Sequence, residues 1–225
     1  MLDKHTHLWM HIVASVQARL GSTRLPGKVL FQLGDRRLLK WSIDRTEVAK
    51  TVDKTVATIG DQPENEALEE YCERNGINYA VGPERNLLVR HLAVAEQTNC
   101  DLLVRITADC PFVPSAEIDR VVKEHLANDA AYTTNVTENM PVGTGVDAID
   151  PSLLAEFESI GESHPVKLAR SKPKEWETMW TENQSWRTIS DAHIAVDTPS
   201  DYWSLTDALD AVGDNPRDVA EWISK

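Results

Sequence analysis

The sequence predicts an α/β protein with a mainly parallel sheet flanked by helices, in a three-layer α/β/α arrangement. Short apolar runs rich in β-branched residues alternate with segments of helical periodicity over most of the chain. Such alternation is typical of βαβ units, whose helices cover both faces of a parallel sheet. A length of 225 residues suits one domain of this class. We therefore predict a single domain over residues 10–225, preceded by a disordered extension at residues 1–9.

The alternation is clearest in the first half of the chain. Leu39 and Ile43 recur at helical spacing, and a second helix opens with Pro63 and closes with Gly76. Ser115 is the expected N-cap of a further helix. We predict strands at residues 11–18, 53–60, 77–81 and 101–107. The helices predicted between and after them cover residues 36–50, 63–76, 85–99 and 115–129.

The pattern loosens after residue 130 but still alternates. Pro151 suits the first turn of a helix, where its missing N–H is not needed. We predict strands at residues 130–136, 145–150 and 192–198, and helices at residues 151–160, 164–172 and 199–212. No internal repeat, low-complexity tract or linker interrupts the chain, which supports the prediction of one domain.

The composition argues against several classes of partner. The chain has 36 acidic and 23 basic residues and a formal net charge of −13. A surface so acidic repels phosphate over most of its area, although a local basic pocket remains compatible with it. We therefore expect no nucleic-acid partner and no membrane partner. An ordinary solvated acidic surface and adaptation to high salt are both compatible with the excess of acids.

The sequence also bears on the compartment. Cys72, Cys100 and Cys110 form no C-x-x-C pair, which suits a reducing environment better than a disulfide framework or a zinc site. No apolar run approaches the ~20 residues that a membrane span requires. The first residues lack the apolar stretch of a signal peptide. We expect a cytoplasmic protein.

One loop concentrates positive charge. The first predicted strand runs into RLGSTRLPGK, which places Arg19, Arg24 and Lys28 beside Gly21 and Gly27. Glycines let backbone N–H groups approach phosphate oxygens, arginine can bind phosphate bidentately, and lysine adds a point charge. The spacing is not that of a Walker P-loop, because five residues separate the glycines and valine replaces the hydroxyl residue after the lysine. We predict a triphosphate-binding loop; a solvated basic turn is the alternative.

Two aspartates are candidate metal ligands. Asp109 follows the fourth predicted strand and Asp197 closes a later one, so both are expected at the edge of the sheet where ligands of α/β proteins bind. Mg²⁺ bound to a triphosphate is usually held by one or two carboxylates, with phosphate oxygens completing its shell. Turn-capping roles are the alternative for both residues. Asp201 is expected in the first turn of a helix, where its charge suits the dipole.

Four motifs carry a family resemblance. QARLGSTRLPGKVL resembles the signature of the CMP-sugar synthetases, the cytidylyltransferases that activate 3-deoxy-octulosonate and acylneuraminates. The resemblance is greatest to the branch of spore-coat polysaccharide biosynthesis and acylneuraminate cytidylyltransferase-like proteins. VGPERNLLVRH, VRITADCPFV and IAVDTPSDY resemble later family motifs in the same order, so the resemblance covers roughly residues 12–205.

The resemblance implies a Rossmann-like nucleotidyltransferase fold, a homodimer and a reaction. The anomeric hydroxyl of a nonulosonate-like sugar acid attacks the α-phosphorus of CTP, and pyrophosphate leaves. Arg19, Arg24 and Lys28 act on the phosphates, and Mg²⁺ on Asp109 and Asp197 assists the transfer. Surface glycan biosynthesis is the implied role.

The nucleoside and acceptor subsites are predicted separately. By resemblance, Ala18, Ser22 and Gly82 lie near the base and ribose, although small residues also suit plain turns. Asp147 and His164 resemble residues on the acceptor side of relatives.

Arg105, on a predicted strand, offers a partner for a sugar carboxylate, with structural pairing as its alternative. Thr144 and Ile149 stand where relatives carry acids, which predicts a different acceptor or weakened activity.

Two other classes of function stay open. The first is a nucleotide-sugar glycosyltransferase or another sugar nucleotidyltransferase, because unrelated activities share this fold. A glycosyltransferase more often shows a D-x-D motif, and the run TADCP lacks the second acid. The second is a nucleotide-binding relative without turnover, which the departures at Thr144 and Ile149 keep open.

Overall fold

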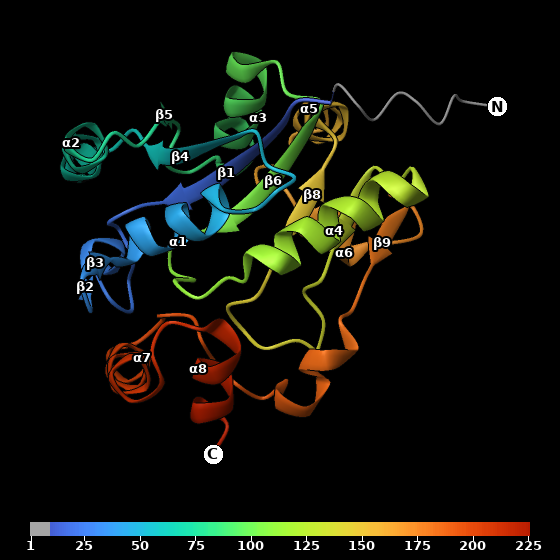
Figure 1. Cartoon of the computed structure of the whole chain (residues 1–225). Helices are drawn as coiled ribbons and strands as arrows, with labels where there is room; N and C mark the ends of the chain where they lie inside the picture. Colours follow the sequence, from blue (N-terminus) through green and yellow to red (C-terminus); the bar gives the residue numbers. More distant parts are fainter. Residues whose placement is uncertain (1–9) are drawn as a thin grey trace.

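The computed structural model describes residues 10–225, so the extension predicted at residues 1–9 lies outside the described residues. Its centre is a seven-stranded sheet in the order β5-β4-β1-β6-β8-β7-β9 (Figure 1). The parallel part consists of four strands: β1 (Ile12–Ala18), β4 (Lys54–Gly60), β5 (Tyr79–Gly82) and β6 (Leu102–Thr107). β8 (Asp147–Ile149) runs antiparallel to β6 and to β7 (Tyr132–Thr134), and β9 (Thr178–Trp180) pairs in parallel with β7. The mainly parallel sheet is therefore confirmed.

Helices cover both faces of this sheet, as Figure 1 shows. One apolar cluster joins the sheet to α1 (Leu38–Glu47), α2 (Glu66–Arg74) and α4 (Ser115–Asn128). A second joins the opposite face to α3 (Leu87–Thr98), α5 (Pro151–Ser159) and α6 (Lys167–Ser171). In β1, Ala14 and Val16 belong to the first cluster and Val13 to the second, as the two-residue period of a strand requires. The predicted α/β/α layers follow from this alternation.

A third apolar cluster lies beside the end of the sheet. It is built on α7 (Pro199–Val212) and α8 (Pro216–Ile223) and includes Leu33, Phe112 and Val196. The remaining elements are a two-stranded ribbon, β2 (Gln32–Leu33) with β3 (Arg36–Arg37), and three short 3-10 helices, η2 (Lys28–Leu30), η3 (Pro63–Asn65) and η4 (Gln184–Ile189). This cluster positions the segment before α7 against the carboxyl ends of the strands. No helix within residues 10–225 is long and apolar enough to cross a bilayer.

Some local predictions were wrong. Residues 192–198 do not form a strand; the segment makes one isolated bridge, between Val142 and His193. It is wedged between two loops, where Ile194 N donates to Val142 O and Val196 N donates to Asp109 O, so no continuous ladder forms. The N-cap of α4 is Pro114 and not Ser115. Two further elements, β9 and α8, were not predicted from the sequence.

Candidate active site

A cavity of about 910 Å³ opens at the carboxyl ends of the parallel strands. Many of the predicted site residues line it: Ala18, Arg19, Ser22, Arg24, Lys28, Asp109, His164 and Asp197. Three predicted residues, Gly82, Arg105 and Asp147, do not line it. The structure therefore brings together the predicted phosphate loop and both predicted metal ligands.

The cationic loop is closed by its own backbone. Leu20 O accepts hydrogen bonds from Ser22 N at 2.8 Å and from Gly27 N at 2.9 Å. Leu20 N in turn donates to Asn65 Oδ1 at 2.8 Å, which ties the loop to the start of α2. Gly27 has φ of +73°, in the left-handed region where a side chain is disfavoured. These constraints place Lys28 at the first position of η2, facing the cavity.

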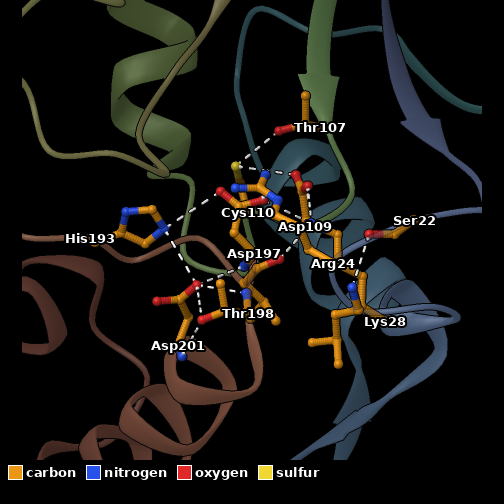
Figure 2. A network of polar contacts seen from close by, with 12 residues as sticks. Ser22, Arg24, Lys28, Thr107, Asp109, Cys110, His193, Asp197, Thr198 and Asp201 are labelled. Atoms are coloured by element: carbon orange, nitrogen blue, oxygen red, sulfur yellow. Dashed lines mark hydrogen bonds and ion pairs between the residues drawn. The ribbon is translucent and has the colours of Figure 1, made fainter.

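Lys28 lies between the two predicted metal ligands (Figure 2). Its Nζ donates to Asp109 Oδ2 at 2.6 Å, to Asp197 Oδ1 at 3.0 Å and to Val196 O at 2.6 Å. Arg24 Nη2 donates to the same Asp197 oxygen at 2.7 Å. Lys28 is only 6% exposed, so its charge depends on these partners. The loop and the two acids thus form one ionic cluster.

Backbone contacts fix the two acids relative to each other. Val196 N donates to Asp109 O at 2.8 Å, which joins the β6 loop to the segment before α7. Asp201 Oδ2 accepts from the N–H groups of Asp197 and Thr198 and forms the capping box of α7. The prediction that Asp201 lies in the first turn of a helix is confirmed, and its carboxylate holds the backbone of Asp197 in place.

The donor set fits magnesium. Asp109 and Asp197 each offer hard carboxylate oxygens, and both lie within hydrogen-bond distance of one cation, the Lys28 ammonium. Over the described residues, no group of three or more His, Cys, Asp and Glu side chains is placed to hold a metal ion. Two carboxylates nevertheless suffice for Mg²⁺, which usually keeps waters and substrate phosphates in its shell. The pair suits a metal that arrives with a triphosphate.

Arg19 has a different partner from the other two cations. Its Nη1 lies 3.4 Å from Glu84 Oε1, on the side of the cavity away from Asp109. Glu84 also accepts from Asn65 Nδ2 at 3.0 Å. A Cβ at Gly60 would lie 1.6 Å from Glu84 Oε2, so glycine is needed where this carboxylate crosses the end of β4. Glu84 therefore holds Arg19 over the ends of β4 and β5.

Arg105 and Asp147 pair with each other and do not line the cavity. Arg105 Nη1 donates to Asp147 Oδ2 at 2.6 Å, and Arg170 Nη2 donates to Asp147 Oδ1. Tyr132 donates its hydroxyl to Asp147 at 2.7 Å. Burial raises the pKa of Asp147, but Arg170 and Arg105 outweigh it and bring the pKa down to about 2. The structural pairing weighed for Arg105 is thus what the structure shows.

This network affects the cavity through its charge. Two guanidinium groups face one carboxylate, which leaves an excess of positive charge beside His164. The pKa of His164 is lowered to about 4, mainly by burial and also by Arg105 and Arg170, while Asp147 and Glu162 act in the opposite direction. His164 is therefore a neutral hydrogen-bonding group at pH 7.

The sequence model of the cytidylyltransferase family matches residues 13–172. The chain belongs to this family. The spore coat polysaccharide biosynthesis protein SpsF of Bacillus subtilis is 28% identical over 215 residues, covering 91% of this chain and 89% of that protein. A 3-deoxy-manno-octulosonate cytidylyltransferase of Idiomarina loihiensis is 29% identical over 147 residues, covering 64% of this chain and 56% of that protein.

Solved structures agree with this assignment. A cytidylyltransferase from Leptospira borgpetersenii superposes with a TM-score of 0.87 at 27% identity, over 95% of this chain and 93% of that one. A CMP:2-keto-3-deoxy-manno-octonic acid synthetase complexed with CTP superposes with a TM-score of 0.66 at 14% identity, over 89% of this chain and 99% of that one. The second likeness shows the fold alone. The family resemblance and the Rossmann-like nucleotidyltransferase fold are both confirmed.

Thr144 and Ile149, where this cytidylyltransferase departs from the family pattern, both lie in the core. Thr144 is fully buried, and its hydroxyl donates to Pro141 O at 2.8 Å. Ile149 is also fully buried and packs in the apolar cluster under α3 and α5. Neither side chain lines the cavity.

Sequence reasoning missed several residues of the site. Glu84 and Arg90 line the cavity, and Asn65 supports both the loop and Glu84. Glu84 and Arg90 belong to VGPERNLLVRH, so two charged residues within a recognised motif were the available signal. Cys110 is buried, and burial together with the neighbouring Asp109 raises the pKa of its thiol.

Proposed function

We propose that this cytidylyltransferase transfers CMP from CTP to the anomeric hydroxyl of a nonulosonate-like sugar acid in surface glycan biosynthesis. The observation that carries the proposal is the ionic cluster of Lys28, Arg24, Asp109 and Asp197 at the wall of a cavity large enough for a nucleotide and a sugar. The family match supports cytidylyl transfer. The named relatives, SpsF and 3-deoxy-manno-octulosonate cytidylyltransferase, support a saccharide acceptor.

In the proposed reaction the sugar oxygen forms a bond to the α-phosphorus of CTP while the bond to the β-phosphate oxygen breaks. The sugar hydroxyl loses its proton, and pyrophosphate leaves with the electron pair. Such transfers depend mainly on positioning and on charges that stabilise the transition state. Arg24 and Lys28 are placed to hold the departing phosphates, and Arg19 extends the cationic wall from the end of β1. These are the roles we assign to the loop.

We propose Asp109 and Asp197 as the ligands of Mg²⁺. When bound there with the triphosphate, the ion supplies Lewis-acid stabilisation of the phosphoryl oxygens. Lys28 occupies the space between the same carboxylates in this structure, so its ammonium neutralises them until the ion arrives. With Mg²⁺ held by Asp109 and Asp197, the Lys28 ammonium would be available to donate to the phosphates.

The acceptor is proposed to be an acid because of the charge beside His164. The Arg105–Asp147–Arg170 network has one more cation than anion, and the neutral His164 and the amide of Gln17 line the cavity next to it. Gln17 Oε1 accepts from Arg105 Nε at 2.9 Å, which leaves its amide N–H groups for a ligand. A carboxylate is the group that this environment favours.

The test measures pyrophosphate release from CTP with Mg²⁺ over a panel of sugar acids that includes 3-deoxy-octulosonate and nonulosonates. We expect release only with CTP and an acidic acceptor, and none with EDTA present. Melting temperatures with CTP, UTP and UDP-sugars are measured beside it. Stabilisation by UDP-sugars alone would instead favour a glycosyltransferase, and CTP binding without release over the whole panel would favour a non-catalytic relative. The homodimer stays a prediction, which sedimentation velocity tests.

A further inference from the structure

A chain of buried polar side chains lies beneath the cavity and ends at Gln17. Gln17 is in β1 and lines the cavity. Its Oε1 lies 2.9 Å from Arg105 Nε and 3.4 Å from His91 Nε2. His91, on α3, is fully buried, and its Nδ1 lies 2.8 Å from Ser15 Oγ. His91 and Ser15 do not line the cavity, so any effect they have on a ligand passes through Gln17.

The partner on β6 fixes which way the Gln17 amide faces. The Nε atom of arginine carries a hydrogen and accepts no hydrogen bond, so the atom opposite Arg105 Nε is the amide oxygen. Asp147 Oδ2 accepts from the same guanidinium at 2.6 Å, which keeps Arg105 in place. The amide nitrogen then lies on the other side, where its N–H groups donate to no group within residues 10–225 and remain accessible. Gln17 therefore presents donors to the cavity.

The same oxygen fixes the tautomer of His91. Burial, together with the charges of Arg105 and Arg90, holds the pKa of His91 well below its ordinary value, so the ring is neutral at pH 7. A neutral imidazole has one donor nitrogen and one acceptor nitrogen. Because the amide oxygen of Gln17 can only accept, Nε2 carries the hydrogen, and Nδ1 accepts from the hydroxyl of Ser15. Two donors therefore converge on the oxygen of Gln17.

This part of the cavity lies beside His164. Leu88 N, at the start of α3, donates to Ser163 O at 3.0 Å, which joins the helix of His91 to the segment that carries His164. A positive charge on His164 would lower the pKa of His91, so the two rings lie near each other. His164 lines the cavity together with Gln17. The amide N–H groups of Gln17 thus face the side of the cavity where the acidic acceptor is proposed to bind.

We propose that His91 is a positioning residue for the acceptor: its Nε2–H group and Arg105 together hold the oxygen of Gln17 inward, so that the amide N–H groups donate to the carboxylate of the sugar acid. A carboxylate only accepts hydrogen bonds, so an amide turned the other way would set oxygen against oxygen. Hydrogen bonds to a charged group are stronger than those between neutral groups. The inference rests on the proposed function, which supplies an acidic acceptor. It makes acceptor affinity depend on a side chain that does not line the cavity.

The first test is Gln17→Glu, in which one oxygen can keep the contacts with Arg105 and His91 while the other faces the cavity. Calorimetry measures binding of 3-deoxy-octulosonate and of a nonulosonate to the full chain loaded with Mg²⁺ and α,β-methylene-CTP, which blocks transfer. Loss of a hydrogen bond to a charged group should weaken binding of the acid by about tenfold or more, well beyond any loss for the CTP analogue. Gln97→Glu, at an exposed glutamine on α3, is the matched control and should bind as the intact chain does. An unchanged acid affinity in Gln17→Glu would overturn the inference and leave the proposed transfer standing.

The second test separates positioning from stability. His91→Gln can place an amide N–H group near the position of the imidazole Nε2, whereas His91→Leu offers no donor, and both alter the same buried site. We expect His91→Leu to bind the acid about tenfold more weakly, and His91→Gln to recover most of that loss. Equal losses in the two variants, or no loss in His91→Leu, would contradict a positioning role.

NMR of the intact chain with isotope-labelled histidine keeps the test independent of folding. The inference requires the hydrogen of His91 to be on Nε2, and a hydrogen on Nδ1 would refute it. Acid binding that weakens in Gln17→Glu, without pyrophosphate release from CTP, would refute the proposed transfer and support the role of His91. If the intact chain bound none of the acids, the acidic acceptor and the inference would both fall.

Discussion

Replacing Lys28 by methionine tests how the ionic cluster works. Methionine keeps much of the length and apolar stem of the lysine but removes three hydrogen bonds, to Asp109, Asp197 and the carbonyl of Val196. The two carboxylates then face each other without the cation between them. Arg24 still donates to Asp197 at 2.7 Å, whereas Asp109 is left with no cationic partner among residues 10–225.

The expected cost follows from burial. Removing one partner of a fully buried ion pair costs about 3–5 kcal/mol. Here the aspartate side chains are 27% and 22% exposed and can recover some hydration. We therefore expect the free energy of unfolding to fall by about 1–3 kcal/mol, the range for a donor or acceptor left unsatisfied. Loss of a preorganised charge on the phosphates should lower kcat by about 100-fold to 1,000-fold.

Metal binding gives a second readout. Because Lys28 occupies the space between the proposed ligands, Mg²⁺ should raise the melting temperature of Lys28→Met by more than it raises that of the intact protein. Urea unfolding, calorimetric melting and pyrophosphate release measure the three effects. Lys172→Met is the matched control, since Lys172 pairs with Glu175 in an exposed contact that contributes about 0–1 kcal/mol. A Lys28→Met protein with native turnover, or one stabilised by Mg²⁺ no more than the intact chain, would refute this account of the cluster.

Four further predictions concern the rest of the site. Asp147→Asn should lower the free energy of unfolding by about 3–5 kcal/mol in urea, because two guanidinium groups are left without their carboxylate, whereas exposed Asp191→Asn should not; a small effect at Asp147 would contradict the network. The pKa of Asp147 is lowered from 3.8 to about 2, so the stability that its carboxylate gives the fold is complete above pH ~4 and is lost as the pH falls towards 2. The free energy of unfolding of Asp147→Asn should therefore not show this loss between pH 4 and 2. His164, with its pKa lowered to about 4, should contribute no inflection to kcat between pH 5.5 and 8, and an inflection that His164→Asn abolishes would show that it titrates there. Gly143→Ala should lower the free energy of unfolding by about 1–3 kcal/mol and weaken Mg²⁺ binding, because the added Cβ would lie 2.7 Å from the backbone of the segment that leads to Asp197. Unchanged unfolding and metal affinity would show that this segment moves to make room for the methyl group.

Much of the fold could be predicted because its determinants are local. The apolar run of β1 and the helical spacing in α1 are properties of neighbouring residues, and each predicted element before residue 130 has a counterpart within a few positions. The phosphate loop was equally local, since its glycines and cations lie within ten residues. The segment at 192–198 was read as a strand because it is apolar and β-branched. It forms no continuous ladder because its hydrogen-bond partners lie on loops more than fifty residues away.

In the candidate site too, features that depend on neighbouring residues could be predicted, whereas features that depend on distant residues could not. Asp109 and Asp197 were chosen for their places after strands, and they do meet, although Asp197 is positioned by Asp201 and by the Asp109 backbone and not by a strand. Glu84 was missed because its sequence neighbours do not indicate that its side chain packs against Gly60, at the end of β4. Arg105 remained ambiguous between ligand binding and pairing, because the answer depended on where Asp147 lay.

By itself the sequence determined the α/β class, the family and the cationic loop, because periodicity and motif spacing are written along the chain. Only the tertiary structure decided which charges are paired and which are free. Lys28 is held between two acids, Arg105 pairs with Asp147, and Nε and Nη1 of Arg90 have no hydrogen-bond partner within residues 10–225. Burial and pairing arise from contacts between residues far apart in the chain, so their free energies cannot be assigned until those residues are brought together.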